Sequence, residues 1–574
     1  MLPRVAQVPE TTRASPLNYK YMNLLVYLWV LKKNGIIFLY LTAAFVALGS
    51  VPFLVKGCGW MMLFAFVPLL YMDKLASERG VKHFWLWHYG AFLLWNAVTT
   101  FWVCNATVGG GIFACVANAF QMSLVFGLYR WVKKRQGGVL PYIFLAAAWI
   151  AWEKWYLVSA QISWPWLVLG NAFARTLPLA QFYEYTGTLG GSLWVWAVNL
   201  SAFGILSSVL DGRWKGFSVK VKASAIAAAS LVLFAPAVWS LCLWKVRAEE
   251  PERTLSVIAF QPNIDPYNKF SALTQKEQNA ILEDQMARAL EISPRALLGR
   301  NDSIHTPVLL LAPETFTYDI VTGEIPSSPT YGRFVGFLKK HPEANLLFGA
   351  SSRTFLPPGD RPSQTARQMY DGRWLESHNS AVIIDSTGRA DIYHKSKLVV
   401  GVEMMPYPGF FRHIDEWLGG VMGRDIGQDS VSLLHFSAGG IDVPIGCAIC
   451  YESVYGEHCA EYVKAGAELL TVITNDAWWG DTPGYKQHLS YASLRAIETR
   501  RWIARSANTG ISAIIDSRGR IVASTPWWEK AALPGTVGLS DGLTFFVRFG
   551  DIPGRISVFI FLLLLAASFL PRRR

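Results

Sequence analysis

The sequence predicts an integral membrane bundle of about eight transmembrane helices, with one α/β domain inserted between the seventh and the eighth. Two observations lead to this prediction. Hydrophobic residues make up 52% of the 574 positions and charged residues only 16%, which is too apolar for an ordinary soluble enzyme. Long runs without Asp, Glu, Lys or Arg also alternate with short basic stretches, whereas residues 246–545 form one long polar stretch.

The runs without charged residues supply the predicted membrane helices. The longest extends from His83 to Tyr129. Because one span needs about 20 residues, we expect two helices here, joined at the glycine-rich residues 105–111. No single soluble core could absorb this much apolar sequence, so the chain is expected to be an integral membrane protein. The other runs are residues 36–55, 57–72, 136–152, 186–210, 223–244 and 556–571.

Basic residues set the expected orientation of the bundle. Lys and Arg concentrate in the cytoplasmic loops of membrane proteins, and here they gather in alternate loops. This pattern accounts for the net charge of +12 without a nucleic-acid partner. It places both ends of the chain in the cytoplasm and the long polar stretch on the opposite side. The basic groups are Lys32 and Lys33, Lys74 to Lys82, Arg130 to Arg135, Arg213 to Lys222, and Arg572 to Arg574.

The chain therefore divides into expected segments. Their boundaries follow the composition, because each falls where apolar sequence meets polar sequence. They are a cytoplasmic N-terminal segment at 1–35, transmembrane helices 1–7 at 36–245, the polar domain at 246–545, and transmembrane helix 8 with a basic cytoplasmic tail at 546–574.

The polar domain is expected to be a layered α/β domain. Short apolar stretches rich in β-branched residues predict strands at 254–261, 307–314, 344–351, 380–386, 441–450 and 469–475. Helical periodicity predicts helices at 274–291 and 485–507, the second with Leu489, Ala492, Ala496 and Ile503 on one face. Near-continuous apolar strands that alternate with helices are typical of layered α/β folds.

Reactive side chains stand at or just beyond the ends of predicted strands. Glu314 ends one strand, Lys395 is followed eight residues later by Glu403, and Cys450 ends another strand. If they converge, the carboxylate could take the thiol proton, the thiol could attack a carbonyl carbon, and the ammonium could stabilise the oxyanion. A helix that begins directly after Cys450 would lower the pKa of the thiol through its N-terminal dipole.

Two other uses of Cys450 are weaker. Cys447 and Cys450 on one strand would point to opposite faces, so they cannot form a disulfide without distortion. The spacing of Cys447, Cys450, His458 and Cys459 matches none of the common closed zinc sites. We therefore expect Cys450 to be a nucleophile and Cys447 to be packing, with no disulfide framework, metal or cofactor.

The motifs around these residues resemble a known superfamily. Glu314 in "APE", Lys395 in "YHK" and Cys450 in "CYE" are similar, in that order, to the Glu-Lys-Cys triad of the nitrilase (carbon–nitrogen hydrolase) superfamily. Joined to eight predicted spans, with the polar domain before the last one, the chain resembles the apolipoprotein N-acyltransferase family over nearly its whole length. "FQPNID", "NDAWWGDTPGYKQH" and "SWPWLVLGN" follow the family pattern as well.

The resemblance implies a fold, a reaction and a location. The polar domain would be a nitrilase-like αββα sandwich on the periplasmic side of a bacterial inner membrane, in a monomeric, multi-pass protein. In a ping-pong reaction, Cys450 would accept a fatty acyl chain from a phospholipid as a thioester. It would then pass the chain to the N-terminal amine of a diacylglyceryl-cysteine on a lipoprotein. Supporting or substrate-binding residues implied by the motifs are Glu403, Tyr451, Glu452 and Trp478.

Apolar loops at 407–411 and 477–480 are expected to form a mouth that faces the membrane. Because water would hydrolyse the thioester, an apolar mouth suits this reaction. Two positions depart from the family pattern, since Val400 replaces a proline and Phe270 stands where a tryptophan is expected. Neither position belongs to the triad.

Two other functions remain open. A membrane-tethered amidase or nitrilase would hydrolyse a small C–N substrate in a closed, water-accessible pocket and would need no opening to lipid. A transport or conjugation component whose nitrilase-like domain only binds would keep its function when Cys450 is replaced by Ala. The scarcity of ionisable residues in the predicted spans argues against transport.

Overall fold

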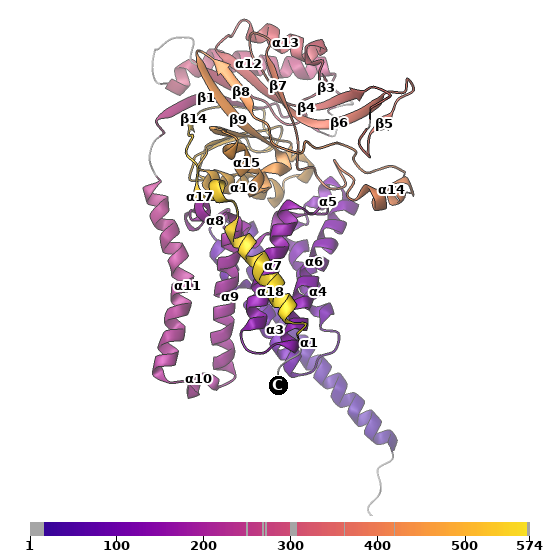
Figure 1. The fold of residues 1–574 in the computed structure, drawn as a ribbon, viewed down its shortest axis with the longest axis vertical. Coiled ribbons are helices and arrows are strands. Elements are labelled where there is room, and N and C mark those ends of the chain that lie inside the picture. The colour runs from indigo at the N-terminus through magenta and orange to yellow at the C-terminus, as the bar shows by residue number, and fades with distance from the viewer. Residues whose placement is uncertain are drawn as a thin grey trace, which may run out of the picture.

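The computed structural model describes residues 16–247, 251–266, 269, 272–298, 307–360, 362–417 and 419–570, and it describes side chains in all of these except 16–34 and 292–298. Helices form one half of the molecule, and two sheets with their own helices form the other half (Figure 1). Phe270 and the basic residues Arg572 to Arg574 lie outside the described residues.

Each predicted membrane run coincides with a helical segment. Among the described residues, five segments are long and apolar enough to cross a membrane: Gly35–Leu54, Gly59–Glu78, Val108–Arg135, Thr188–Leu210 and Val219–Val246. Ile552–Ala567 is apolar but shorter, so the total of eight spans stays a prediction. The helices of the bundle are α1 (Pro16–Leu54), η1 (Gly59–Met61), α2 (Met62–Ala65), α3 (Val67–Glu78), α4 (Trp85–Thr100), α6 (Val108–Arg135), α7 (Leu140–Val158), α9 (Thr188–Leu210), α11 (Val219–Val246) and α18 (Ile552–Ala567).

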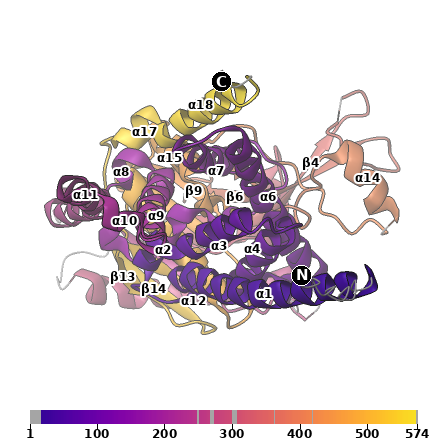
Figure 2. The ribbon, with the colours of Figure 1, turned by 90° about the horizontal axis from the view of Figure 1, so that it is seen from below.

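Helix α11 lies at the edge of the bundle in both views (Figures 1 and 2). Its apolar side chains are largely exposed, for example Leu231 at 68% and Phe234 at 58%. Such a surface is unfavourable in water but suits contact with lipid. Helix α18 packs along α7, so the chain enters the polar domain after α11 and returns to the bundle with α18.

The polar domain contains two mixed sheets. The first has the order β14-β1-β2-β4-β6-β5, with β3 beside β4 and β7 beside β6, and the second has the order β13-β12-β11-β10-β9-β8. Strands β9, β10 and β11 are parallel, so their carboxyl ends meet at one edge. The strands are β1 (Arg253–Gln261), β2 (Val308–Leu311), β3 (Thr317–Val321), β4 (Ala344–Leu356), β5 (Arg367–Gln368), β6 (Trp374–Ile384), β7 (Ala390–His394), β8 (Leu434–Ala438), β9 (Ile441–Ile449), β10 (Leu469–Thr474), β11 (Ile503–Ala507), β12 (Ala513–Ile515), β13 (Ile521–Ser524) and β14 (Ala531–Leu539).

The two sheets pack face to face between layers of helices. Leu309 and Val472 belong to the core between the sheets, whereas Leu310, the next residue on β2, packs in the core on the other face. This alternation reflects the side-chain period of two along a strand. The result is an αββα arrangement, with α12 (Gln275–Leu298) and α13 (Pro329–Leu338) on one side and α15 (Gly456–Lys464) and α16 (Pro483–Thr499) on the other.

Helix α16 is shorter than the sequence predicts. The predicted helix over 485–507 is wrong beyond Thr499, because Arg500 adopts a left-handed conformation with φ 52° and ends the helix. Residues Ile503–Ala507 then form β11, which pairs in parallel with β10. Ile503 therefore lies in a sheet and not on a helical face.

Helix α16 also joins the two halves of the molecule, because both of its faces are buried. One face, with Leu489, Ala492 and Ala496, belongs to the core of the sheets. The other face, with Tyr491, Leu494 and Ile497, belongs to the core of the membrane bundle. The bundle and the polar domain therefore share a helix.

Candidate active site

Cys450 stands at the carboxyl end of β9, at the edge where the parallel strands of the second sheet end. Its backbone is left-handed, with φ 52°, which is uncommon and strained for a residue with a Cβ. The chain then enters the short 3-10 helix η6 (Cys450–Val454), and α15 begins only at Gly456. A short 3-10 helix, and not a regular α-helix, therefore begins at Cys450, and a sharp turn carries the thiol.

Lys395 lies between two carboxylates. Its Nζ is 2.7 Å from Glu403 Oε1 and 3.2 Å from Glu314 Oε1, and its side chain is fully buried. Glu314 comes shortly after β2, and Lys395 follows β7 directly. The structure therefore brings together three side chains from two segments that follow strands of the first sheet: Glu314 after β2, and Lys395 and Glu403 after β7.

An amide group and two backbone N–H groups orient the carboxylates. Asn379 Nδ2 donates to Glu314 Oε1 at 2.8 Å and to Glu403 Oε1 at 2.7 Å. Asn475 N donates to Glu314 Oε2 at 3.0 Å, and Val399 N donates to Glu403 Oε2 at 2.7 Å. Sequence reasoning missed Asn379, although an amide directly before an apolar strand stretch is a signal that could have drawn attention to it.

Electrostatics keep Lys395 charged and Cys450 neutral at rest. Although burial works the other way, Glu403 and Glu314 hold the pKa of Lys395 well above its ordinary value. Burial and the Glu314 carboxylate raise the pKa of the Cys450 thiol well above its ordinary value, against the attraction of Lys395. The net effect on the thiol pKa is thus an increase, so a nucleophilic role of the sulfur would require a base.

Glu452 joins two loops of the site. Its Oε1 accepts hydrogen bonds from Tyr393 Oη at 2.7 Å and from Ser396 N at 2.7 Å, and its Oε2 accepts one from Ile449 N at 2.8 Å. Burial favours the neutral acid, but His458, whose Nε2 is 3.2 Å away, and these donors lower the pKa of Glu452. The Glu452 carboxylate is therefore an anionic clamp: it connects Ser396, which follows Lys395, to Ile449, which precedes Cys450.

Tyr451 packs against a loop of the membrane half. Its hydroxyl donates to Ser163 O at 3.1 Å. Its ring is stacked with Trp164 and Trp166, at centroid distances of 6.2 and 6.4 Å and interplanar angles of 16° and 11°. Ser163 Oγ and Tyr455 Oη share a further hydrogen bond of 3.0 Å. Helix η6 therefore rests on the seam between the two halves of the molecule.

Trp478 and Trp479 lie in the short 3-10 helix η7 (Asp476–Trp479), which follows β10. Trp478 is 38% exposed, whereas Trp479 packs on Trp102 with ring centroids 4.8 Å apart. Asn105 Nδ2 donates to Trp479 O at 2.9 Å. The contact of Trp478 with substrate stays a prediction, and Trp479 is the ring that ties this segment to the bundle.

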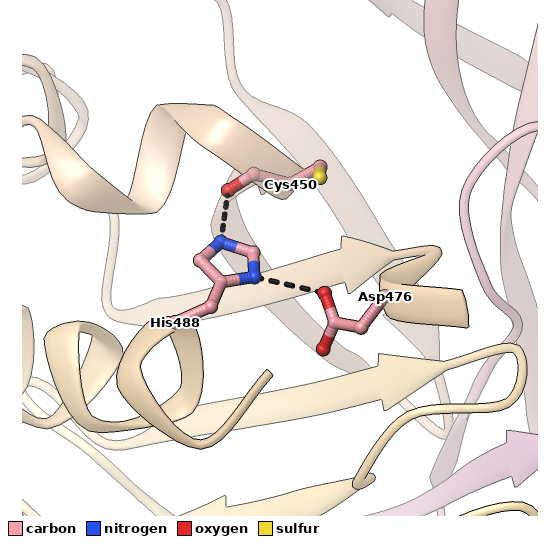
Figure 3. A group of neighbouring side chains, drawn as sticks. All are labelled: Cys450, Asp476 and His488. Atoms are coloured by element: carbon pink, nitrogen blue, oxygen red, sulfur yellow. Dashed lines mark hydrogen bonds and ion pairs between the residues drawn. The ribbon is translucent and has the colours of Figure 1, made fainter. Parts of the chain in front are cut away.

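One further group, which includes Cys450, has the composition of a metal site. Cys450, Asp476 and His488 each offer one ligand atom, and these atoms lie within 4.8 Å of one another (Figure 3). Both ring nitrogens of His488 and both carboxylate oxygens of Asp476 already have hydrogen-bond partners. A metal ion would have to displace these buried hydrogen bonds.

Two family descriptions match the chain. "Apolipoprotein N-acyltransferase N-terminal domain" matches residues 42–201, and "Carbon-nitrogen hydrolase" matches residues 362–541. The first match lies in the helical bundle. The second contains Lys395, Glu403 and Cys450, while Glu314 lies before it.

Curated proteins named apolipoprotein N-acyltransferase are similar over most of the chain. The protein from Chlorobaculum tepidum is 28% identical over 85% of this chain and 88% of its own length. The protein from Pseudomonas syringae is 26% identical over 86% of this chain and 90% of its own. A protein from Treponema denticola with the same name and the number 2 is 25% identical over 93% of both chains.

Two solved structures match about half of the chain. An amidase from Nesterenkonia sp. is 16% identical, with a TM-score of 0.34, and covers 51% of this chain and 92% of its own. A branch 10 member of the nitrilase superfamily from Saccharomyces cerevisiae is 14% identical, with a TM-score of 0.35, and covers 51% of this chain and 92% of its own.

Proposed function

We propose that this chain, which resembles the apolipoprotein N-acyltransferases over most of its length, is a membrane acyltransferase that moves a fatty acyl chain from a phospholipid to the N-terminal amine of a lipoprotein. The position of Cys450 carries the proposal. Burial and Glu314 raise the pKa of the Cys450 thiol, and Lys395 lowers it. The turn that contains Cys450 packs against a loop of the membrane bundle through Tyr451. A hydrolase for small soluble substrates would not need a nucleophile at this seam.

Exposed apolar side chains on a helix that follows Glu403 in the chain support a lipid substrate. Helix α14 (Pro408–Trp417) follows the loop of Glu403 and projects to one side above the bundle (Figure 1). Phe410 is 65% exposed and Trp417 is 83% exposed. The prediction of a loop at 407–411 is wrong from Pro408 on, because Pro408–Trp417 is helical. Amphipathic helices with such side chains bind membrane interfaces, which supports a position of α14 at the membrane.

In the first half-reaction Cys450 takes the acyl chain. Glu314 accepts the thiol proton while the sulfur attacks the ester carbonyl carbon of the phospholipid, and Lys395 donates to the developing oxyanion. When the ester C–O bond breaks, the leaving oxygen takes the proton from Glu314 and the lysophospholipid departs. The product is a thioester on Cys450.

In the second half-reaction the amine of a diacylglyceryl-cysteine attacks the thioester carbon. Glu314 takes a proton from the attacking nitrogen, and Lys395 again stabilises the oxyanion. As the C–S bond breaks, the proton passes from Glu314 to the sulfur, so an amide forms and Cys450 returns to the thiol. One difficult acyl transfer thereby becomes two easier ones.

Glu403 sets the charge of the cluster. With both carboxylates ionised and Lys395 protonated, the cluster carries a net negative charge, which disfavours a thiolate nearby. Transfer of the thiol proton to Glu314 makes the cluster neutral at the moment when the sulfur becomes negative. The second carboxylate, 2.7 Å from Lys395 Nζ, therefore holds the lysine in place without opposing the attack.

The proposal includes a topology. Residues 246–545 would lie on the periplasmic side of a bacterial inner membrane, with seven transmembrane helices before them and one after them, in a protein that works as a monomer. A reporter placed at Tyr370, which is fully exposed, should be accessible from the periplasm. A cytoplasmic location would contradict this orientation.

Acylation of a purified diacylglyceryl lipopeptide tests the function. In phospholipid micelles the full chain should add one fatty acyl group to the peptide amine, measured as a mass increase. Glu314→Gln should slow this transfer by about 100-fold or more, because the thiol then lacks its base. Glu324→Gln, an exposed carboxylate on the same half, should leave it unchanged. Hydrolysis of small amides without any acylated peptide would support the amidase function instead.

A further inference from the structure

We propose that His488 is a positioning residue for the nucleophile: its ring holds the carbonyl group of Cys450 and so maintains the left-handed turn that presents the thiol. This role rests on the proposed function of Cys450 as the acyl carrier. The sequence motifs assign no role to His488, which lies on α16, the helix shared by the two halves.

His488 lies between the backbone of the nucleophile and Asp476 (Figure 3). Its Nε2 is 2.9 Å from the Cys450 carbonyl oxygen, and its Nδ1 is 2.9 Å from Asp476 Oδ1. Asp476 Oδ2 accepts a hydrogen bond from Arg505 Nη2 at 2.6 Å. His488, Asp476 and Arg505 are at most 1% exposed. They form a fixed, buried chain of contacts that ends on the Cys450 carbonyl.

The Cys450 carbonyl oxygen can only accept, so Nε2 of His488, 2.9 Å away, is the donor of this hydrogen bond. The other ring nitrogen, Nδ1, lies 2.9 Å from Asp476 Oδ1 and 3.2 Å from Arg505 Nη2. Arg505 and His488 hold the pKa of Asp476 well below its usual range although burial works the other way. The ring is therefore held on one side by a buried ion pair while its other side donates to the Cys450 carbonyl.

The carbonyl that His488 holds belongs to the strained residue. Cys450 has φ 52°, and a side-chain-bearing residue stays in this region only when its surroundings fix it there. Ser453 Oγ donates to the same carbonyl at 2.8 Å, but Ser453 belongs to η6 and moves with the turn. His488 comes from another helix, so it anchors the Cys450 carbonyl itself to a separate element of the domain.

Two other roles for His488 fit the geometry less well. A general base would have to face the sulfur, yet the ring faces the carbonyl oxygen of Cys450 and the sulfur lies at the other end of that residue (Figure 3). A metal ligand, acting with Cys450 and Asp476, would have to give up both ring hydrogen bonds. It would also place a cation beside Arg505.

Alkylation of Cys450 by iodoacetamide measures how the thiol is presented and needs no lipid. We would follow the Cys450 peptide by mass spectrometry in the full-length protein in detergent. His488→Ala is expected to slow this alkylation, and kcat for acyl transfer, by about 100-fold, because a small displacement of a reacting atom costs this much. KM for the phospholipid should change less than about threefold. The amide of His488→Gln can still donate to the carbonyl. Both rates should therefore be at least about tenfold higher in His488→Gln than in His488→Ala.

The matched control is His435→Ala, a partly exposed histidine on the edge strand β8, which should behave as the wild type. Normal alkylation and normal kcat in His488→Ala would overturn the proposal. If that variant does not fold, the His488→Gln result decides. Loss of both rates in His488→Gln with an unchanged thermal midpoint would indicate a base, and loss of wild-type activity on chelation, reversed by Zn²⁺, would indicate a metal. Alkylation that depends on His488 in a protein without acyl transfer would refute the proposed function and leave the positioning role intact.

Discussion

At the scale of single residues, Asn379 holds both carboxylates of the site with one amide group. Its Nδ2 donates to Glu314 Oε1 at 2.8 Å and to Glu403 Oε1 at 2.7 Å, while its Oδ1 is buried without a hydrogen-bond partner among the described residues. A neutral donor orients the two acids without changing the charge of the cluster. An aspartate at this position would add a third negative charge, which would repel both.

Gly349 on β4 leaves room for the proposed base. A Cβ at this position would lie 2.5 Å from Glu314 Cα and 2.5 Å from Thr315 N, which are backbone atoms and cannot turn aside as a flexible side chain can. Gly349→Ala should therefore displace Glu314 and lower kcat for acyl transfer by about 100-fold, with little change in KM. Steady-state kinetics with a lipopeptide acceptor measures both quantities.

Gly336 on α13 is the matched control, because no atom of the described residues beyond its chain neighbours and its own helix backbone lies within 4 Å of a Cβ there. Alanine is favoured over glycine inside a helix by about 1 kcal/mol. Gly336→Ala should keep full activity and slightly raise the thermal midpoint. Equal activity of the two alanine variants would contradict the close packing behind Glu314.

At the scale of elements, strand ends were predictable and tertiary contacts were not. Glu314 and Cys450 could be found because each ends an apolar run, a pattern that local sequence contains. The change from helix to strand after Thr499 could not be found, because Ile503–Ala507 is compatible with either period and only its pairing with β10 decides. The contact of His488 with the Cys450 carbonyl joins residues that are 38 positions apart, so no local sequence pattern predicts it.

The clamp formed by Glu452 leads to a prediction about stability. Glu452→Gln keeps the shape of the side chain, but its NH₂ group can face backbone N–H groups that need an acceptor. Each buried donor left unpaired costs about 1–3 kcal/mol. We expect a lower thermal midpoint and a loss of acyl transfer. Both are measured on the detergent-purified protein.

The control for this clamp is Glu461→Gln on α15. Glu461 is 62% exposed and lies 3.9 Å from His458, the same histidine that contacts Glu452. It should change neither the thermal midpoint nor the activity. A Glu452→Gln protein with the stability of the wild type would mean that the two loops hold together without the clamp.

At the scale of the whole molecule, buried contacts join the bundle and the polar domain into one unit. Thr188 N and Oγ1, at the start of α9, donate to Glu498 Oε1 at 2.8 and 2.6 Å, and Arg495 Nη2 donates to Thr188 Oγ1 at 2.8 Å. These contacts set the position of the thiol relative to the bundle. The bundle itself was predictable, because apolar length is visible in sequence. The contacts between the bundle and the polar domain were not predictable, because in sequence Thr188 resembles the ordinary start of a helix.

The stability of the molecule should decrease in mild acid. His394 is stacked on His378 with ring centroids 4.2 Å apart, and burial and His378 lower the pKa of His394 from 6.5 to about 4. The unfolded chain therefore binds more protons at this site than the folded chain does between these pH values. The free energy of unfolding should fall as the pH decreases through this window, by at most about 3 kcal/mol.

Thermal midpoints at neutral pH and near the lower end of this window measure the effect. His394→Gln should remove part of the decrease seen in the wild type. His413→Gln, at a side chain that is 82% exposed, should keep all of it. The same pH dependence in the wild type and in His394→Gln would show that another group is responsible.

The mass of the group carried by Cys450 tests directly whether its sulfur is the acyl carrier. The full chain is incubated with labelled phospholipid, quenched in acid, digested and examined by mass spectrometry. We expect one fatty acyl group on the Cys450 peptide, released by hydroxylamine, absent in Cys450→Ala, and lost when a diacylglyceryl lipopeptide is added. An acyl adduct that persists unchanged in Cys450→Ala, or an active protein that never carries one, would contradict this role of the sulfur.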